Sequence, residues 1–323
     1  MEKNIALIGA GYWGKNHLKN LYRLGVLGAV FDKDKKTISE RIKEYPDVIF
    51  LENDEKILNN PTIKAVVIAA PAALHYEIAK KYLISGKDVL VEKPIALKVE
   101  QAKELVKISK NNKNILMVGH ILQYHPAVIK LKELIDNNEL GDIRYIYSNR
   151  LNIGKLRVEE NVLWSFAPHD ISLILMLMNN QRPKKINAFG EAYITEGIYD
   201  VTLTTLEFEN RVKAHVFVSW LHPFKEQKLV VVGSEKMAVF DDLNEEKLLI
   251  YPHKIDFING NIPIARKAEF YPVEIERKEP LKEELLHFID CVENRKVPKT
   301  DGMEGLRVLE VLERAEKSLR KNR

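Results

Sequence analysis

The sequence predicts an α/β protein with a doubly wound parallel sheet, followed by an α+β domain with a large, open, mostly antiparallel sheet. Three glycines, Gly9, Gly11 and Gly14, stand directly behind a short apolar run at residues 5–8. Continuous apolar runs of strand length recur up to residue 118, whereas apolar and polar residues alternate after about residue 185. Continuous runs indicate strands buried on both faces of a parallel sheet, and alternation indicates a sheet with one covered face.

The glycine loop has the context of a dinucleotide-binding turn, because a strand precedes it and a helical pattern follows it. The first glycine allows a sharp turn, the second lets a pyrophosphate approach the backbone, and the third lets the helix pack close to the strand. The N-terminus of that helix offers free N–H groups and a positive dipole end to the phosphates. Another protein with a glycine-rich turn is the alternative explanation.

Asp32 follows Gly14 by 18 residues (32 − 14), close to the ~20 expected for a carboxylate that binds both ribose hydroxyls. A carboxylate at this position repels a 2′-phosphate, so the sequence favours NAD over NADP. Lys33 and Lys35 weaken this preference, because either side chain could reach a phosphate.

Five apolar runs predict the strands of the first domain, at residues 5–8, 28–31, 65–69, 89–91 and 115–118. Residues with helical spacing lie between the runs, and strand–helix units joined by right-handed crossovers give a doubly wound sheet. We place a dinucleotide-binding domain at residues 1–122 and a substrate-binding and oligomerisation domain at residues 123–323.

In the second domain, Pro126 opens a helix that ends near Gly141. Period-two alternation predicts strands at residues 188–194, 201–208, 212–220 and 228–232. We expect a long loop at residues 254–268 and closing helices at 281–293 and 303–319. Because few helices remain to cover the second face of this sheet, we expect a homodimer or homotetramer that buries it.

Composition narrows the class of protein. A length of 323 residues suggests about two domains, and the net charge of +4, with lysines interspersed among glutamates, argues against nucleic-acid binding. The longest apolar stretch, at residues 171–178, is far shorter than the ~18 residues of a membrane span. A single cysteine, Cys291, and the absence of a signal peptide favour the cytoplasm. The histidines lack metal-ligand spacing, so we expect no metal.

Two positions are candidates for acid–base chemistry. Lys93 follows a parallel strand, where ligands of open α/β sheets bind, and could stabilise a substrate alkoxide; an ordinary surface lysine is the alternative. His169 precedes the apolar stretch at residues 171–178 and could accept a proton as a neutral imidazole. Alternatively, His169 and Asp170 form the N-terminal cap of a helix, with Asp170 favouring the helix dipole. Both roles could hold together, with Asp170 capping and His169 reacting.

A cationic segment lies between the two predicted sheets. Arg150, Lys155 and Arg157, with Asn152 and Asn161, could hold a carboxylate or a pyrophosphate. A solvated loop is an equally good interpretation of this segment.

The glycine loop, Ala70-Pro71 with His75, the Glu92-Lys93-Pro94 motif and the later His169 together resemble the glucose–fructose oxidoreductase/inositol dehydrogenase (Gfo/Idh/MocA) family. The resemblance extends over nearly the whole chain. It implies a Rossmann domain, a second domain with a large open sheet that packs into dimers or tetramers, and hydride transfer between nicotinamide and a sugar or cyclitol carbon.

The resemblance also implies roles for individual positions. Cofactor-binding positions lie along the loop and the strand ends, at Gly9, Gly11, Tyr12, Trp13, Gly14, Asp32, Ala70, Pro71, His75, Glu92 and Lys93. Substrate-binding positions are Arg150, Asn152, Arg157, Trp164, Ser165 and His169. Lys93 and His169 would be catalytic, with Lys93 on the reacting hydroxyl and His169 as the base.

One position departs from the family pattern. Many members have an aspartate four residues before the catalytic histidine, where this chain has Ser165. Either Ser165 and Lys93 suffice, or Asp170 compensates, or the chain is weakly active. We expect an NAD-dependent oxidoreductase of a sugar ring carbon, resembling members that act on nucleotide-linked sugars in surface-polysaccharide synthesis. The alternatives are a cyclitol or free-sugar dehydrogenase, or a non-catalytic sensor that binds NAD and a sugar.

Overall fold

The computed structural model describes residues 2–154 and 156–321, and the chain divides into two compact units. Unit 1 comprises Met1–Ile121 and Glu279–Leu309, and unit 2 comprises Leu122–Lys278 and Glu310–Arg323. The chain passes from unit 1 to unit 2 after Ile121, next to the expected domain boundary at residue 122. It returns to unit 1 at Glu279 and enters unit 2 again at Glu310, and neither change of unit was expected from the sequence.

Unit 1 contains a six-stranded, entirely parallel sheet with strand order β3-β2-β1-β4-β5-β6. Its strands are β1 (Ile5–Ile8), β2 (Leu27–Phe31), β3 (Phe50–Leu51), β4 (Ala65–Ile68), β5 (Asp88–Glu92) and β6 (Leu116–Gly119). The strand order reverses between β1 and β4, and ligands of such sheets bind beyond the strand ends at this point. The doubly wound parallel sheet is therefore confirmed, with β3 as a two-residue strand too short to predict.

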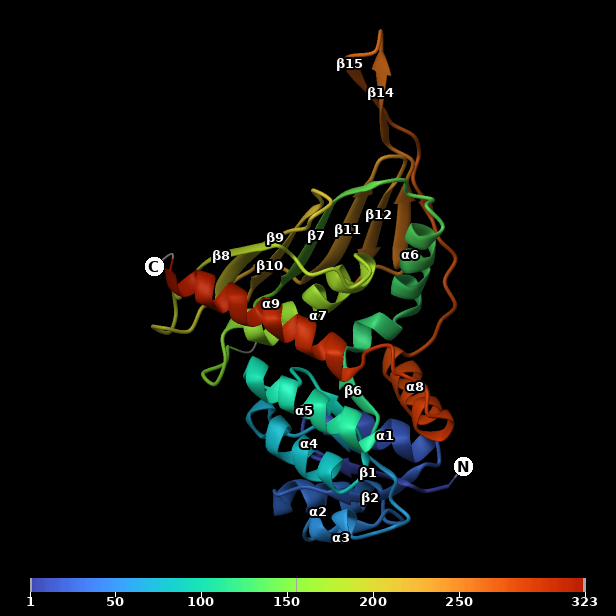
Figure 1. Cartoon of the computed structure of the whole chain (residues 1–323), viewed down its shortest axis with the longest axis vertical. Coiled ribbons are helices and arrows are strands. Elements are labelled where there is room, and N and C mark those ends of the chain that lie inside the picture. The colour runs from blue at the N-terminus through green and yellow to red at the C-terminus, as the bar shows by residue number, and fades with distance from the viewer. Residues whose placement is uncertain (1, 155, 322–323) are drawn as a thin grey trace. The chain divides into compact units, whose positions relative to one another are not determined.

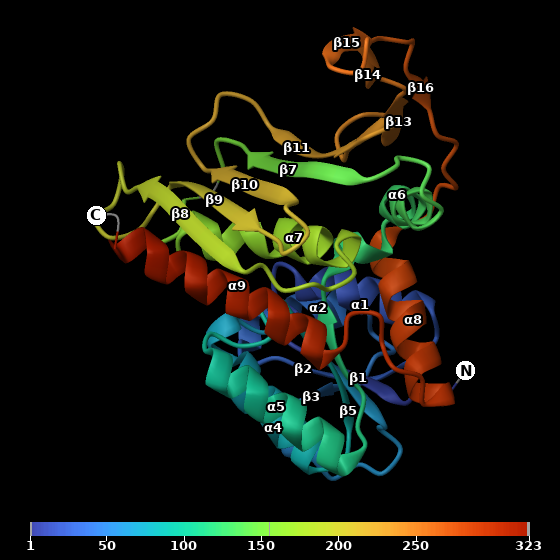
Figure 2. The ribbon, with the colours of Figure 1, turned by 45° about the horizontal axis from the view of Figure 1, so that its top comes forward.

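Helices connect the strands of unit 1 and close it. They are α1 (Gly14–Arg23), α2 (Lys35–Glu44), α3 (Glu55–Leu58), η1 (Ala72–Leu74), α4 (His75–Ile84), α5 (Val99–Asn112) and α8 (Pro280–Asn294). The long helix α9 (Gly302–Lys321) begins in unit 1 and ends in unit 2. Helix α8 lies beside α1 (Figures 1 and 2), where Asn20 of α1 donates to Glu279 at 3.0 Å.

Unit 2 is built on an eight-stranded sheet with order β16-β13-β12-β11-β7-β10-β9-β8. Its strands are β7 (Ile143–Leu151), β8 (Lys185–Glu191), β9 (Val201–Glu207), β10 (Lys213–Ser219), β11 (Glu226–Gly233), β12 (Met237–Asp241), β13 (Leu248–Tyr251) and β16 (Tyr271–Pro272). All neighbours are antiparallel except β7 and β10. The large, mostly antiparallel sheet is confirmed, but β7, β12, β13 and β16 were not among the predicted strands. In β7, polar residues interrupt the apolar positions.

One face of this sheet is covered by helices α6 (Pro126–Asp136), α7 (Val162–Leu177) and the end of α9 (Figure 2). The short helix η2 (Ile121–Tyr124) precedes α6. Residues that face the other way along β7 and β10 include Tyr145, Tyr147, His215 and Phe217, and they are only partly buried. Along the described part of the chain, no helix is long and apolar enough to cross a membrane.

Two expectations for unit 2 are wrong. Residues 254–268 form a hairpin of β14 (Lys254–Ile258) and β15 (Ile262–Arg266), which stands apart from the large sheet (Figure 1), rather than a loop. Asn259 and Gly260 both have positive φ, as Asn-Gly hairpin turns require, and this signal was overlooked. Helix α7 begins at Val162, with Asn161 as its N-cap, so His169 and Asp170 lie inside the helix and do not begin it.

Candidate active site

The glycine loop of unit 1 has the geometry that a dinucleotide requires. Gly9 has φ +93, and a Cβ there would lie 2.7 Å from the carbonyl oxygen of Ala69. A Cβ at Gly14 would lie 2.1 Å from the carbonyl oxygen of Gly9. A Cβ at Gly11 would meet nothing within 4 Å. Gly9 therefore lets the loop pack against the backbone after β4, and Gly14 lets helix α1 begin against Gly9. Gly11 leaves the backbone open to an approaching group.

Asp32 is fixed beside this loop at the end of β2. Its carboxylate accepts hydrogen bonds from the backbone N–H groups of Ala10 at 2.7 Å and Asp34 at 2.8 Å. Helix α1 begins at Gly14 without a side-chain cap, and the N–H groups of Lys15 and Asn16 donate to the carbonyl oxygens of Gly11 and Trp13 at 3.1 and 2.9 Å. The open backbone, the helix N-terminus and the carboxylate fit the diphosphate and ribose of NAD.

His75 connects the ends of two neighbouring strands. Its Nε2 lies 2.8 Å from the carbonyl oxygen of Ala70, after β4, and its Nδ1 lies 2.7 Å from that of Pro94, after β5. The ring is almost fully buried. His75 therefore links the backbone after β4 to that of Pro94, which adjoins Lys93, and Lys93 is half-buried at the same edge of the sheet.

The carboxylate of Glu92 contacts side chains of helix α1. Its Oε1 accepts hydrogen bonds from Trp13 Nε1 at 2.5 Å and from His17 Nε2 at 2.8 Å, and its Oε2 accepts from the backbone N–H of Lys93 at 3.2 Å. Burial raises the pKa of Glu92, but the bonds from His17 and Trp13 and the charge of Lys93 outweigh it and leave that pKa lowered. Glu92 is thus a buried anion that joins the glycine-loop helix to the Lys93 position.

In unit 2, Arg150 of β7 forms an ion pair with Asp170 of α7. Arg150 Nε and Nη2 donate to the Asp170 carboxylate at 2.9 and 3.1 Å, and Ser148 Oγ donates to it at 2.7 Å. Asp170 is 1% exposed. The predicted role of Asp170 at a helix start is therefore wrong, and the charge of Arg150 is already compensated within the unit.

The other substrate candidates lie along α7 and after β7. Ser165 is buried one turn before the half-buried His169. Trp164 donates from Nε1 to Glu316 of α9 at 2.7 Å. The buried Oδ1 of Asn152 has no hydrogen-bond partner among the described residues.

Arg157 pairs with Glu160 at 2.6 Å, so the solvated-loop interpretation describes this side chain. Lys155 lies outside the described residues. The structure thus brings Gly9–Gly14, Asp32, His75, Glu92 and Lys93 together in unit 1, and Arg150, Ser165 and His169 belong to unit 2.

Three residues that hold these groups were not predicted from the sequence: His17, Ser148 and Glu316. His17 stands four residues after Trp13, so helical spacing places both on one face of α1, and this spacing is visible in the sequence. The other two act across elements far apart in the chain, and no local pattern identifies them.

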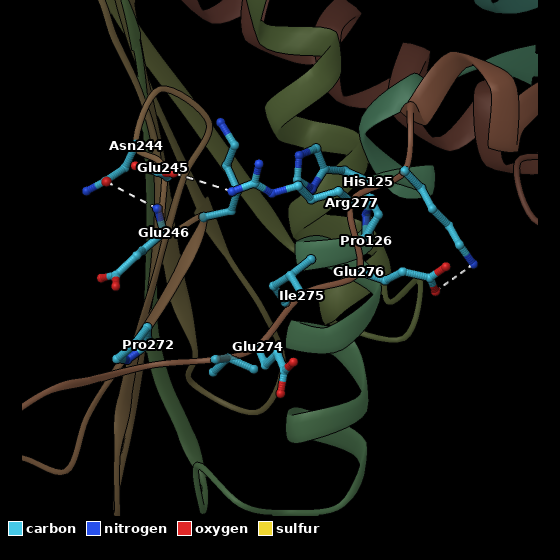
Figure 3. A pocket seen from close by; sticks show the side chains of 13 residues that line it. His125, Pro126, Asn244, Glu245, Glu246, Pro272, Glu274, Ile275, Glu276 and Arg277 are labelled. Atoms are coloured by element: carbon cyan, nitrogen blue, oxygen red, sulfur yellow. Dashed lines mark hydrogen bonds and ion pairs between the residues drawn. The ribbon is translucent and has the colours of Figure 1, made fainter.

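A groove of about 1040 Å³ in unit 2 lies away from all predicted site residues (Figure 3). His125 and Pro126 of α6, the turn at residues 244–247 and the segment 272–278 line it. Charges of both signs line it, and two ion pairs lie there: Arg277 bonds Glu245 at 3.3 Å and Lys278 bonds Glu276 at 2.9 Å. This groove therefore shows no preference for a ligand charge.

Two family models match the chain. Residues 3–120 match the oxidoreductase family with an NAD-binding Rossmann fold, and residues 128–239 match the GFO/IDH/MocA C-terminal domain. The chain belongs to the GFO/IDH/MocA family. The family resemblance and the NAD cofactor expected from the sequence are therefore confirmed, and this GFO/IDH/MocA chain is an NAD-binding oxidoreductase.

Relatives of this GFO/IDH/MocA chain include two dehydrogenases of similar length. UDP-N-acetylglucosamine 3-dehydrogenase of Acidithiobacillus ferrooxidans is 26% identical over 96% of this chain and 95% of its own. scyllo-Inositol 2-dehydrogenase (NAD(+)) of Bacillus subtilis is 26% identical over 96% of this chain and 93% of its own.

Solved structures share the fold. The Acidithiobacillus ferrooxidans enzyme superimposes with a TM-score of 0.86 at 24% identity, covering 98% of this chain and 97% of that one. GenD2 from gentamicin A biosynthesis, solved in complex with NAD, has a TM-score of 0.82 at 20% identity, covering 99% and 94%.

Proposed function

We propose that this protein is an NAD-dependent dehydrogenase that oxidises a ring hydroxyl of a nucleotide-linked sugar to a ketone. Family membership and the loop left open at Gly11 support the cofactor half of the proposal. The full-length similarity to a UDP-N-acetylglucosamine 3-dehydrogenase supports the substrate class.

The reaction converts a secondary alcohol and NAD into a ketone, NADH and a proton, and NAD supplies the hydride acceptor. We assign two tasks to side chains of this chain. The Lys93 ammonium donates a hydrogen bond to the substrate oxygen and stabilises its developing negative charge. The His169 imidazole accepts the hydroxyl proton, which requires its neutral form.

Ser165 stands where many members of the family have an aspartate, and in this proposal its hydroxyl orients His169. Since a hydroxyl supplies no negative charge, the imidazolium formed in the reaction lacks a compensating carboxylate at that position. Asp170 does not replace it, because two donors of Arg150 and one of Ser148 already engage its carboxylate.

A thermal-shift panel tests the substrate class. The protein is heated with UDP-N-acetylglucosamine, UDP, free N-acetylglucosamine or inositol, each with and without NAD. A ligand at 100 times its dissociation constant stabilises by about 2.7 kcal/mol, so binding gives a clear shift in Tm. We expect the nucleotide sugar to give the largest shift, with NADH formation from the same compound.

Two other outcomes of the thermal-shift panel would contradict the proposal. Stabilisation and turnover by inositol alone would replace the nucleotide-sugar assignment with a cyclitol dehydrogenase, which the relative from Bacillus subtilis makes a specific alternative. Stabilisation by a sugar without any NADH formation would contradict the catalytic proposal and favour a sensor.

A further inference from the structure

Glu284 on α8 is a buried acid for which the reaction has no use. It is fully buried, and neither of its carboxyl oxygens has a hydrogen-bond partner among the described residues. Buried polar groups are nearly always hydrogen-bonded, and an unpaired carboxylate in such a place is strongly unfavourable. The position of this side chain in unit 1 therefore requires an explanation.

The negative charge that acts on Glu284 is that of Glu92. Burial and the charge of Glu92 both hold the pKa of Glu284 well above its usual value. Two carboxyl groups that share a buried site do not both ionise readily, so one keeps its proton. Glu92 has partners that favour its charged form, namely Trp13, His17 and Lys93, and its pKa is lowered. The proton therefore belongs to Glu284.

His17 supplies the complementary group. The ring is fully buried, and its Nε2 must carry a proton to donate to Glu92. Its Nδ1 has no hydrogen-bond partner in the described part of the chain. A neutral imidazole accepts at that nitrogen, whereas a protonated Glu284 donates from its hydroxyl. A hydrogen bond between them, direct or through one water, would satisfy both groups.

We propose that Glu284 is a positioning residue, a neutral acid that leaves Glu92 as the single buried anion fixing α1 and Lys93 at the cofactor edge. The strand β6 leaves Glu92 little freedom, because a Cβ at Gly119 would lie 3.0 Å from its Oε2. Among the described residues, the titratable groups that act on the pair of Glu92 and Glu284 are His17 on α1 and Lys93 after β5.

Infrared difference spectroscopy tests the protonation directly. We compare the protein with Glu284→Gln and with Glu293→Gln, an exposed glutamate of the same helix. At neutral pH, we expect the protein and Glu293→Gln to show the C=O stretching band of a protonated carboxylic acid, which Glu284→Gln lacks. Identical spectra for the protein and Glu284→Gln would overturn the proposal, since Glu284 would then be ionised.

The pH dependence of stability provides a second test. Because its folded-state pKa is raised, Glu284 contributes stability that is fully present below the ordinary carboxyl pKa of about 4.3 and is lost as pH rises through the raised pKa. The Tm of Glu284→Gln relative to that of the unaltered protein should therefore rise as the pH increases from the ordinary carboxyl pKa of about 4.3 into the alkaline range. A constant difference across this range would contradict the proposal.

NADH binding tests whether the neutral form of Glu284 is the one that supports the cofactor edge. We expect Glu284→Gln to retain NADH affinity within about twofold, because glutamine mimics the neutral acid, and Glu92→Gln to weaken it about tenfold by removing charge-assisted bonds. A tenfold loss in Glu284→Gln, with its Tm unchanged, would show that the charged form is needed. No sugar is used, so these outcomes are independent of the proposed substrate.

Discussion

At the scale of single residues, the position of Lys93 depends on the residues on either side of it in the chain. Lys93 is held between Glu92 and Pro94, both of which are anchored, Glu92 by His17 and Pro94 by His75. This anchoring fixes the backbone from which the Lys93 ammonium extends. The residues that carry out the proposed reaction thus depend on neighbours that never touch the substrate.

Lys93→Ala and His169→Ala should lower turnover much more than NAD binding, because both groups act mainly in the transition state. For His169→Ala we expect a loss on the order of 10²–10⁴ in kcat, the usual effect of removing a general base. Steady-state NADH formation and NADH titration measure the two quantities separately. Near-normal turnover in both variants would refute the assigned mechanism.

Ser165→Asp should leave turnover unchanged or raise it, because an aspartate would supply the carboxylate that many family members have at this position. The same NADH-formation assay measures this effect.

Asp32 should determine the choice of cofactor. Its carboxylate is positioned by the N–H groups of Ala10 and Asp34, so it can accept ribose hydroxyls and repel a 2′-phosphate. Calorimetry should show tighter binding of NAD than of NADP, and Asp32→Ala should narrow the gap. If the unaltered protein bound NADP as tightly as NAD, this role of Asp32 would be excluded.

At the scale of elements, two glycines of the strand–turn–helix unit β1–α1 have different roles: Gly14 is needed for stability and Gly11 for NAD binding. Gly14→Ala places a Cβ against the carbonyl of Gly9 and should destabilise the protein by about 1–3 kcal/mol or more. Gly11→Ala meets no protein atom and should change stability by no more than about 0.5 kcal/mol. Its methyl group would occupy the space offered to the diphosphate, so NAD affinity should fall at least about tenfold.

Denaturant unfolding and NADH titration of these two variants give four numbers that test this separation. The glycine assignments hold only if Gly14→Ala loses stability and Gly11→Ala loses NAD affinity without losing stability. A stable Gly11→Ala variant with normal NAD affinity would mean that the diphosphate does not approach the backbone there.

At the scale of the whole molecule, one face of the large sheet, opposite the face that α6 and α7 cover, has only partly buried side chains. On β7 and β10, Tyr145 and Tyr147 lie beside His215, whose Nδ1 is 2.8 Å from the Tyr145 hydroxyl oxygen. Exposed apolar and aromatic faces of a sheet are usually interfaces. We therefore predict a dimer or tetramer that buries this face.

Light scattering should report an oligomer at micromolar concentration, and Phe217→Lys on the uncovered face should weaken the association. A matched control is Ile84→Lys at the end of α4, an exposed apolar residue of unit 1 that is not on this sheet. A monomer of the unaltered protein, or equal effects of both substitutions, would contradict the prediction.

Several features of this protein follow from the sequence alone. The parallel strands are buried on both faces and therefore read as continuous apolar runs, and the glycine loop and Asp32 are local patterns that fix the cofactor-binding turn. The pattern failed where local signals were weak or misread. Polar residues interrupt the apolar positions of strand β7, so its sequence does not alternate clearly. The hairpin β14–β15 exposes apolar residues on both strands. Pro168 lies inside α7, although a proline usually marks the start of a helix.

Only the tertiary structure decided which charges pair. Arg150 and Asp170 are 20 residues apart, His17 and Glu92 are 75 apart, and Glu284 belongs to a helix that returns to unit 1 late in the chain. Local spacing encodes elements, because neighbours along the chain share a turn or a strand. Pairing of buried charges depends on which elements pack together, and this is why Glu92 and Glu284 emerge as a pair only in the folded protein.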